Sequence, residues 1–435
     1  MLNIIRLERA GPLNGSVQIQ GSKNSSLSLM AASCLCDHPV TLSGIPDIYD
    51  IRVICDIADD IGMATTRHPN GDITLDPGSI HSAAIDKEKA SSYRASYYFI
   101  GALLAKFGKV DIGFPGGDNF VSRPIDQHVK GLKAMGATFT FHEDHYTVEA
   151  KRLTGADIYF DTITSGATIN CMLAAVLADG RTVLRGAAKD PEVVDTAIML
   201  NEFGAKITGA GTDTIRIEGV NSLRGGQHTV IPDRLIAGAF LMSAGIAGGS
   251  VTVTDVIPDH LGSCIAKLTE IGLHFDVQEQ SITASSTGKL KATRVRTAMY
   301  PGFATDLQQP LTALLTGALG KSIITEKVYP KRFQHVAQLR RMGADIEVRG
   351  NSAFIRGGLP LTGSWVHASD IRAGTCLLLA GLAAEGTTCI TGIEHIERGY
   401  EDAITAFRSL GVTIALEQVD AAHAEEKLRI GRAGL

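Results

Sequence analysis

Val110-Asp-Ile-Gly-Phe-Pro-Gly-Gly-Asp-Asn-Phe-Val-Ser-Arg-Pro124 reads as a short strand that enters a loop, and the amphipathic run that follows, Asp126 to Met135, reads as a helix. Proline cannot join a strand ladder and glycine frees the backbone, so the middle of this stretch is expected to be a loop. Gly136 stands where a helix is capped at its C-terminus. Found once, this pattern would indicate only an ordinary surface loop.

The closing glycine recurs along the whole chain at a spacing of about 70 residues. The glycines are Gly62, Gly136, Gly204, Gly272, Gly343 and Gly411. Upstream of each lies an apolar, alanine-rich run with almost no polar face, which predicts a buried helix. These runs are Leu27–Cys36, Tyr97–Lys106, Ile169–Ala178, Ala237–Ala247, Leu311–Leu319 and Cys376–Ala384. The sequence of each unit therefore predicts, in order, a strand, a buried helix, a strand, an amphipathic helix and further strands.

The number and length of these units predict the fold class. Units of this length are too long for a solenoid repeat, and their all-round apolar helices need sheets on more than one side. We therefore predict an α/β fold with two globular domains of three repeat units each. The buried helices would lie inside each domain with sheets around them, and the active site would lie in the cleft between the domains.

Composition and charge limit the classes of function. The chain has 435 residues, of which 44% are hydrophobic and 20% charged, as in ordinary globular proteins. Its net charge of -5 argues against nucleic acid as a partner but allows a local site for a small anion. The start resembles no signal peptide, and the longest apolar run, Ala373 to Ala384, is too short to span a membrane. Seven cysteines without zinc spacing indicate reduced core residues and a cytoplasmic location.

Polar residues fall at two recurring places in the units, the starts of the two helices. The buried helices start at Lys23 with Asn24, Arg94, Ser165 with Gly166, Asp233 with Arg234, Asp306, and Asp370 with Arg372. The second helices start at Arg123, Asp190 with Glu192, Arg332 and Arg398. Helix N-termini favour anions. If these ends face inward, the cleft gains a cationic set suited to phosphate plus carboxylate, namely Lys23, Arg94, Arg123, Arg332, Arg372 and Arg398.

Two aspartates have possible chemical roles in such a cleft. Asp306 would be a carboxylate among cations and thus a candidate general base, and Asp118, on the glycine-rich loop, a candidate acid carried on a lid. The plainer interpretation is that aspartates at helix starts are caps, as could hold for Asp190, Asp233 and Asp370. Arginines that recur at one phase of a repeat favour the anion-binding enzyme.

The ordered motifs resemble those of the enolpyruvyl transferases, in the branch that uses a nucleotide sugar. They include Gly21-Ser-Lys-Asn24, Tyr93-Arg-Ala-Ser96, Pro115-Gly-Gly-Asp118, Ser122-Arg-Pro-Ile-Asp-Gln-His128, Pro191-Glu-Val-Val-Asp195, Pro232-Asp-Arg234, Phe303-Ala-Thr-Asp-Leu-Gln308, Arg332-Phe333, Ala368-Ser-Asp-Ile-Arg372 and His395-Ile-Glu-Arg-Gly-Tyr400. The resemblance covers nearly the whole chain. It implies two domains of three inverse α/β units, 22–230 and 1–21 plus 231–418, with a charged tail, 419–435, that we expect to be frayed.

The resemblance also implies the reaction and its residues. The enolpyruvyl group of phosphoenolpyruvate would pass to the 3-hydroxyl of UDP-N-acetylglucosamine with release of phosphate, the first committed step of peptidoglycan synthesis, with no cofactor or metal and in a monomer or weak homo-oligomer. The implied catalytic residues are Asp118, Asp306, Lys23 and Arg398. The implied donor-binding residues are Lys23, Asn24, Arg123, Arg332, Arg372, Arg398 and Asp370. The implied acceptor-binding residues are Asn24, Arg94, Arg123, Pro124, Ile125, Asp126, Gln127, Ser165, Gly166, Asp306 and Val328.

Several positions depart from the family pattern. Asp118 stands where most members carry the cysteine that fosfomycin alkylates, so we predict intrinsic resistance to fosfomycin. Thr162–Ser165, Ile236 and Lys331 differ on the acceptor side. The same transfer to another uridine nucleotide therefore stays open, while shikimate 3-phosphate fits the motifs less well. A non-catalytic binding paralogue is disfavoured because the donor-binding set is intact.

Overall fold

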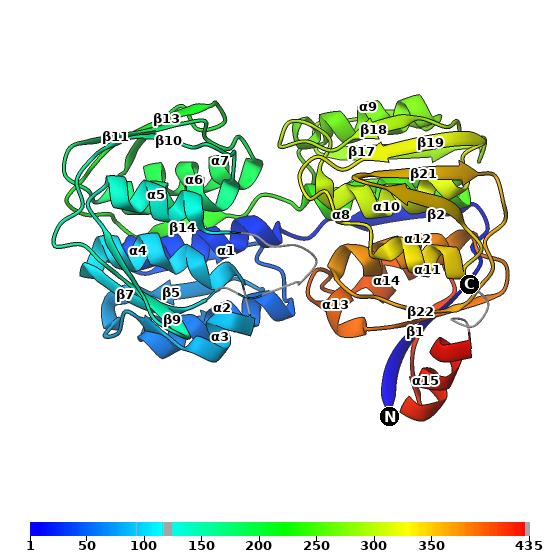
Figure 1. The fold of residues 1–435 in the computed structure, drawn as a ribbon, viewed down its shortest axis with the longest axis horizontal. Coiled ribbons are helices and arrows are strands. Elements are labelled where there is room, and N and C mark those ends of the chain that lie inside the picture. Colours follow the sequence, from blue (N-terminus) through cyan, green and yellow to red (C-terminus); the bar gives the residue numbers. More distant parts are fainter. Residues whose placement is uncertain (93, 115, 117–123, 431–435) are drawn as a thin grey trace. The chain divides into compact units, whose positions relative to one another are not determined.

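The computed structural model describes residues 1–92, 94–114, 116 and 124–430, and its chain divides into two compact units (Figure 1). One unit, Gly21–Ile231, is continuous in sequence. The other is discontinuous and joins Met1–Gln20 to Pro232–Leu435. We call them the continuous unit and the discontinuous unit.

The continuous unit alternates helices with short strands. Its helices are α1 (Lys23–Ala32), α2 (Tyr49–Ile61), α3 (Lys87–Ser92), α4 (Tyr98–Phe107), α5 (Asp126–Ala134), α6 (Ser165–Val176) and α7 (Pro191–Glu202). Its strands are β3 (Val40–Ser43), β4 (Ala64–Arg67), β5 (Ile73–Asp76), β6 (Ala84–Ile85), β7 (Lys109–Gly113), β8 (Thr138–Phe141), β9 (His145–Glu149), β10 (Asp157–Tyr159), β11 (Arg181–Arg185), β12 (Lys206–Thr208), β13 (Thr214–Glu218) and β14 (Gly226–Thr229).

The discontinuous unit repeats this alternation. Its helices are α8 (Arg234–Ala247), α9 (Gly262–Ile271), α10 (Gln308–Thr316), α11 (His335–Arg341), α12 (Ile371–Ala383), α13 (Ile393–Glu397), α14 (Ala403–Arg408) and α15 (Ala421–Ile430). Its strands are β1 (Leu2–Glu8), β2 (Leu13–Gln18), β15 (Gly249–Thr254), β16 (His274–Val277), β17 (Ser281–Ser286), β18 (Arg294–Arg296), β19 (Gly320–Thr325), β20 (Asp345–Arg349), β21 (Ser352–Gly357), β22 (Trp365–His367), β23 (Thr387–Thr391) and β24 (Ile414–Val419).

Each unit has three four-stranded sheets within the described residues. In β10-β11-β13-β12, a parallel edge strand precedes an antiparallel hairpin, and β6-β7-β9-β8 and β18-β19-β21-β20 repeat this order. Strands distant in sequence complete the other sheets. The last strand of the continuous unit, β14, pairs in parallel with its first, β3. In the discontinuous unit, β2 pairs with β15, and β1 lies between β23 and β24. Each unit is thereby closed into a ring of three repeats.

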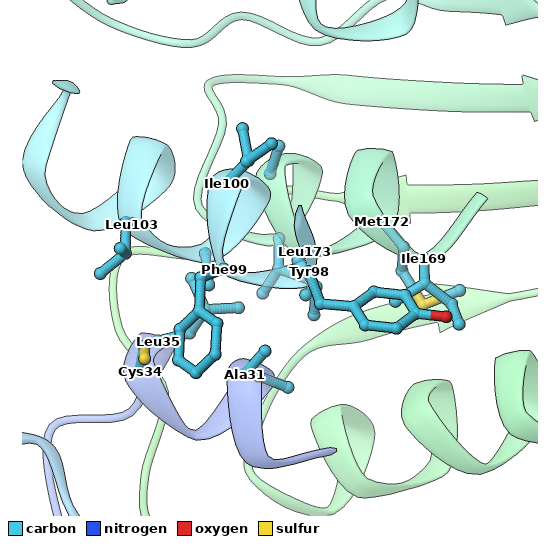
Figure 2. Packing of buried hydrophobic residues seen from close by; sticks show 14 of the residues in the cluster. Ala31, Cys34, Leu35, Tyr98, Phe99, Ile100, Leu103, Ile169, Met172 and Leu173 are labelled. Atoms are coloured by element: carbon cyan, nitrogen blue, oxygen red, sulfur yellow. The ribbon is translucent and has the colours of Figure 1, made fainter. Parts of the chain in front are cut away.

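The apolar helices lie at the centre of each unit, as the sequence predicted. In the continuous unit, α4 packs against both α1 and α6. Leu35, just after α1, Phe99 of α4 and Leu173 of α6 are fully buried there (Figure 2). In the discontinuous unit, α8, α10 and α12 all pack against one another. Because every face of these helices touches another helix or a sheet, no polar face is needed.

The closing glycines are confirmed as helix ends. All six have a positive φ, between 87° for Gly411 and 117° for Gly272. This left-handed backbone is strained for residues with a Cβ and open to glycine, which explains why glycine recurs at this place. Repetition of one backbone requirement thus produced the spacing seen in the sequence.

The expectation of a frayed C-terminal tail is wrong for most of its length. Strand β24 continues to Val419, which pairs with Leu2 of β1. Helix α15 follows and is anchored by Ala424, which is fully buried, and by Arg341, whose Nη2 donates to the carbonyl oxygen of Lys427 at 2.8 Å. The high charge of this segment marks the exposed face of a docked helix. Among the described helices, no segment is both long and apolar enough to cross a membrane.

Candidate active site

Asp306 lies between two arginines in the discontinuous unit. It belongs to a short 3-10 helix of one turn, Thr305–Leu307, which leads into α10. Arg332 Nη1 donates to Asp306 Oδ1 at 2.5 Å. Arg372 donates to Asp306 Oδ2 through both Nε at 3.2 Å and Nη2 at 3.0 Å. The three residues come from distant parts of the chain, so the fold creates this cluster.

Burial makes the contacts of this cluster strong. The side chain of Arg332 is 4% exposed, that of Arg372 is 8% exposed, and that of Asp306 is 26% exposed. Burial acts to raise the pKa of Asp306, but the charges and hydrogen bonds of Arg332 and Arg372 outweigh it and hold the pKa far below its usual range. The cluster keeps one positive charge in excess and thus attracts a further anion.

Other predicted residues of the discontinuous unit lie around the start of α12. The carboxylate of Asp370 accepts hydrogen bonds from the backbone N–H groups of Arg372 and Ala373, so Asp370 caps α12 and orients Arg372. Arg398 ends α13. The next residue, Gly399, is so close to Ile371 that a Cβ there would lie 2.6 Å from Ile371 Cγ2. The backbone that carries Arg398 therefore packs against the first residue of α12.

The interpretation of helix-start aspartates as caps holds for two of the three candidates. Asp233 accepts hydrogen bonds from the N–H groups of Leu235 and Ile236, and Asp370 caps α12 as described. Asp190 precedes α7, but its side chain makes no capping hydrogen bond, so that interpretation is wrong. Pro191 and Glu192 start this helix, and the negative charge of Glu192 favours its N-terminus.

Lys23 and Asn24 begin α1 in the continuous unit. Lys23 Nζ lies 2.8 Å from Oδ2 of Asp50, whose side chain is 1% exposed. The hydroxyl of Ser22 caps the helix by accepting from the N–H of Ser25. The sequence therefore correctly placed Lys23 and Asn24 at a helix start, but gave no sign that Asp50 holds the lysine.

The predicted acceptor residues of the continuous unit lie at two helix starts. Ile125 precedes α5, whose first residues are Asp126 and Gln127, and Gln127 Nε2 donates to Asp126 Oδ2 at 2.8 Å. Ser165 and Gly166 start α6. A Cβ on Gly166 would lie 2.6 Å from the Tyr97 hydroxyl oxygen, so this helix start needs glycine to approach Tyr97.

The remaining predicted residues fall into two groups. Asp118, Arg123 and the side chain of Arg94 lie outside the part of the chain that the structure describes. Two others are described: Pro124 is exposed, and Val328, on the segment between β19 and α11, is partly buried. The roles assigned to all of these residues remain predictions.

Sequence reasoning missed three groups beside the predicted sites. Glu326 is fully buried next to Val328, and His335 is fully buried one turn after Arg332. Burial, helped by the charge of Arg332, lowers the pKa of His335 to about 3, so its ring is neutral at pH 7. In the continuous unit, His228 lies between Asp195 at 2.9 Å and Glu202 at 2.8 Å. For Glu326, the sequence offered one signal of a buried polar group, namely a charged residue at the end of an apolar strand, in Ile323-Ile-Thr-Glu326.

Two rings of three repeats and an aspartate held between two buried arginines are in keeping with an enzyme that handles carboxylate and phosphate groups. The chain belongs to the EPSP synthase (3-phosphoshikimate 1-carboxyvinyltransferase) family, whose model matches residues 7–407. It is therefore a carboxyvinyl, or enolpyruvyl, transferase.

Comparison with individual proteins narrows this class. The chain is 46% identical over 420 residues to UDP-N-acetylglucosamine 1-carboxyvinyltransferase 2 of Bacillus cereus, covering 97% of this chain and 98% of the relative. It is 48% identical over 408 residues to the protein of the same name from Bacillus subtilis (strain 168), covering 94% and 95%.

Solved structures share the fold over nearly the whole chain. The enolpyruvyl transferase NikO from Streptomyces tendae matches with a TM-score of 0.88 at 25% identity, covering 96% of this chain and 100% of that chain. EPSP synthase from Acinetobacter baumannii matches with a TM-score of 0.71 at 19% identity and the same coverage. The predicted fold class of repeated α/β units is thereby confirmed.

Proposed function

We propose that this enzyme transfers the enolpyruvyl group of phosphoenolpyruvate to the 3-hydroxyl of UDP-N-acetylglucosamine and releases phosphate. The observation that carries the proposal is the buried cluster of Asp306, Arg332 and Arg372, which suits a carboxylate-bearing donor and a hydroxyl acceptor. High identity to two UDP-N-acetylglucosamine 1-carboxyvinyltransferases over nearly the full chain supports this acceptor over another uridine nucleotide.

The donor carboxylate would bind Arg332 and Arg372. Their guanidinium groups present paired N–H donors, which match the two oxygens of a carboxylate. Both side chains are buried, so little water competes for them. Lys23, Arg123 and Arg398 would hold the phosphate, and Asn24 would contact both substrates. Asp370 would act by capping α12 and thus orienting Arg372.

Donor binding would also activate Asp306. Without donor, the two arginines hold the pKa of Asp306 far below its usual range, which makes it a weak base. A donor carboxylate that takes over part of these contacts weakens that stabilisation and brings a second negative charge close by. Both effects raise the basicity of Asp306. The base would therefore become effective only when the donor is present.

The reaction then proceeds by addition and elimination. Asp306 takes the proton of the sugar 3-hydroxyl as its oxygen bonds to C2 of phosphoenolpyruvate, and an acid, which we assign to Asp118, adds a proton to the methylene carbon. The tetrahedral adduct next loses that carbon's proton and breaks the C–O bond to phosphate. The products are the enol ether and inorganic phosphate. The cationic side chains stabilise the departing phosphate, and the proposal requires no metal or redox step.

The residues assigned to the acceptor belong to both units. Arg123 to Gln127 would contact the uracil, Ser165 and Gly166 the diphosphate at the start of α6, and Val328 the sugar. A helix N-terminus favours the diphosphate charge. Arg94 would support the anionic end of the nucleotide. We place the enzyme in the cytoplasm, at the first committed step of peptidoglycan synthesis, as a monomer or weak homo-oligomer.

Phosphate release tests the proposal directly. The enzyme is mixed with phosphoenolpyruvate and, in separate reactions, UDP-N-acetylglucosamine, uridine monophosphate or shikimate 3-phosphate. We expect release with the nucleotide sugar alone and an enol ether visible by NMR. Release only with uridine monophosphate would establish the other uridine nucleotide class, and release with none of the three would contradict the proposal.

A further inference from the structure

Glu326 is a buried carboxylate at a junction of the segments that carry Asp306 and Arg332. It follows β19 directly and is fully buried. Its own backbone is tied to Asn351, because Glu326 N donates to the Asn351 carbonyl oxygen at 2.8 Å and Asn351 Nδ2 donates to the Glu326 carbonyl oxygen at 3.2 Å. The carboxylate therefore projects from a fixed point of the sheet.

Four neutral groups among the described residues donate to this carboxylate. Oε1 accepts from the hydroxyl of Thr297 at 2.6 Å and from the backbone N–H groups of Val328 at 2.8 Å and Tyr329 at 3.0 Å. Oε2 accepts from the hydroxyl of Thr305 at 2.9 Å. One side chain thus joins the end of β18, the turn that carries Asp306, and the segment that leads to Arg332.

The direction of each hydrogen bond is fixed by the neighbouring donors. Arg332 Nη1 donates to Thr305 Oγ1 at 3.2 Å, and Lys327 N donates to Thr297 Oγ1 at 2.9 Å. Each threonine hydroxyl has one proton, and since arginine and backbone N–H groups only donate, that proton points to Glu326. Glu326 must accept at every contact, which an ionised carboxylate does and an amide cannot.

The contacts of Glu326 also determine where Arg332 lies. Arg332 N donates to the Tyr329 carbonyl oxygen at 2.9 Å, and its guanidinium lies over the Tyr329 ring, 5.7 Å from the centroid. Tyr329 is held by Glu326 through its N–H. The same guanidinium contacts Thr305 and Asp306. Glu326 therefore holds Arg332 from two sides.

We propose that Glu326 is a positioning residue for enolpyruvyl transfer, which fixes the turn of Asp306 and the guanidinium of Arg332 through Thr305 and Tyr329. This inference rests on the proposed function and adds Glu326 and Thr305 to it. Neither residue touches the reacting atoms. Their effect is on the geometry of a base and a donor-binding arginine, where small displacements cost large factors in rate.

Three variants separate positioning from mere stability. Glu326→Gln keeps the shape but turns an N–H₂ group toward Thr305, where it competes with Arg332 for the hydroxyl oxygen. Thr305→Val removes the link, and Thr305→Ser retains it. We expect the first two to lower kcat for phosphate release about 10- to 100-fold, with the KM for UDP-N-acetylglucosamine within a few-fold, and Thr305→Ser to be close to wild type.

A matched control and a double variant sharpen the test. Thr312→Val removes a buried hydroxyl whose hydrogen bond among the described residues stays within α10, to the carbonyl oxygen of Gln308, and should keep wild-type kcat. Glu326→Gln combined with Thr305→Val should be no slower than the worse single variant, because both break one link. Folded Glu326→Gln and Thr305→Val enzymes with wild-type kcat would overturn the inference, as would Thr305→Ser as slow as Thr305→Val.

Failure of the proposed function would look different. Wild-type enzyme without phosphate release contradicts the reaction but leaves the positioning role testable by crystallography. In Thr305→Val, which does not depend on Glu326→Gln folding, we expect the contact between Arg332 Nη1 and Asp306 Oδ1 to lengthen beyond hydrogen-bond distance. An unchanged contact would overturn the role of Glu326 and Thr305.

Discussion

Replacing Asp306 with asparagine should separate the two roles of the arginine cluster. The change removes a negative charge from between Arg332 and Arg372, whose side chains are 4% and 8% exposed. Loss of one partner from a buried pair costs about 3–5 kcal/mol, and because Asp306 is a quarter exposed we expect about 3 kcal/mol. For a domain of this size that lowers the Tm of the discontinuous unit by about 6–12 °C.

Turnover and donor binding should move in opposite directions in this variant. Loss of a general base lowers kcat about 10²- to 10⁴-fold. The donor carboxylate no longer competes with Asp306 for the two arginines, so phosphoenolpyruvate should raise the Tm of the variant more than that of the wild type. Phosphate release and differential scanning calorimetry, with and without phosphoenolpyruvate, measure these effects.

The control for this experiment is an exposed ion pair of the same unit. Glu385→Gln breaks the pair of Glu385 and Arg9, whose side chains are 62% and 59% exposed, and should change neither kcat nor Tm beyond error. Wild-type turnover in Asp306→Asn would reject Asp306 as the base. If Asp306→Asn loses turnover but phosphoenolpyruvate raises its Tm no more than that of the wild type, then Asp306 and the donor carboxylate do not compete for the two arginines.

Three further predictions concern single residues. Arg372→Lys replaces a two-donor fork with a point charge and should raise the KM for phosphoenolpyruvate about tenfold in steady-state kinetics, whereas an unchanged KM would remove Arg372 from the donor site. Burial opposes a charge on His228, but Asp195 and Glu202 outweigh it and raise its pKa, so its stabilisation is full below pH about 6.5 and is lost as pH rises through the folded pKa. Urea unfolding should therefore show a decline in stability toward alkaline pH that His228→Asn lacks, and identical pH profiles would count against this network. Fosfomycin should leave turnover of the wild type unchanged over time, because the carboxylate of Asp118 forms no thioether, and Asp118→Cys should become sensitive, so time-dependent inactivation of the wild type would contradict the assignment.

The sequence predicted the features that depend on local backbone and on burial. The closing glycines have the positive φ that their recurrence indicated. Runs with no polar face became the central helices of each unit because only full enclosure suits such a surface. Asp306, Arg332 and Arg372 were each recognised as chemically notable, since their phase in the repeat was unusual for simple caps.

Partners across long distances in sequence could not be predicted. Arg332 and Arg372 stand 26 and 66 positions from Asp306, and their contacts depend on how the starts of α10 and α12 pack together. The same holds for Glu326, since a glutamate after a strand reads as solvated until three segments enclose it. The docked helix α15 was missed because its composition is charged, its buried residue Ala424 is small, and Arg341, which holds it, lies far away in sequence.

The place of β1 and β2 in the discontinuous unit has a consequence for how the protein is made. These strands are synthesised before the continuous unit, but their partners β15, β23 and β24 are synthesised after it. The continuous unit can close its ring as soon as β14 meets β3. The nascent chain can therefore complete the continuous unit before the discontinuous unit. Until their later partners are made, β1 and β2 keep open strand edges, and a chaperone that covers strand edges would act during this time.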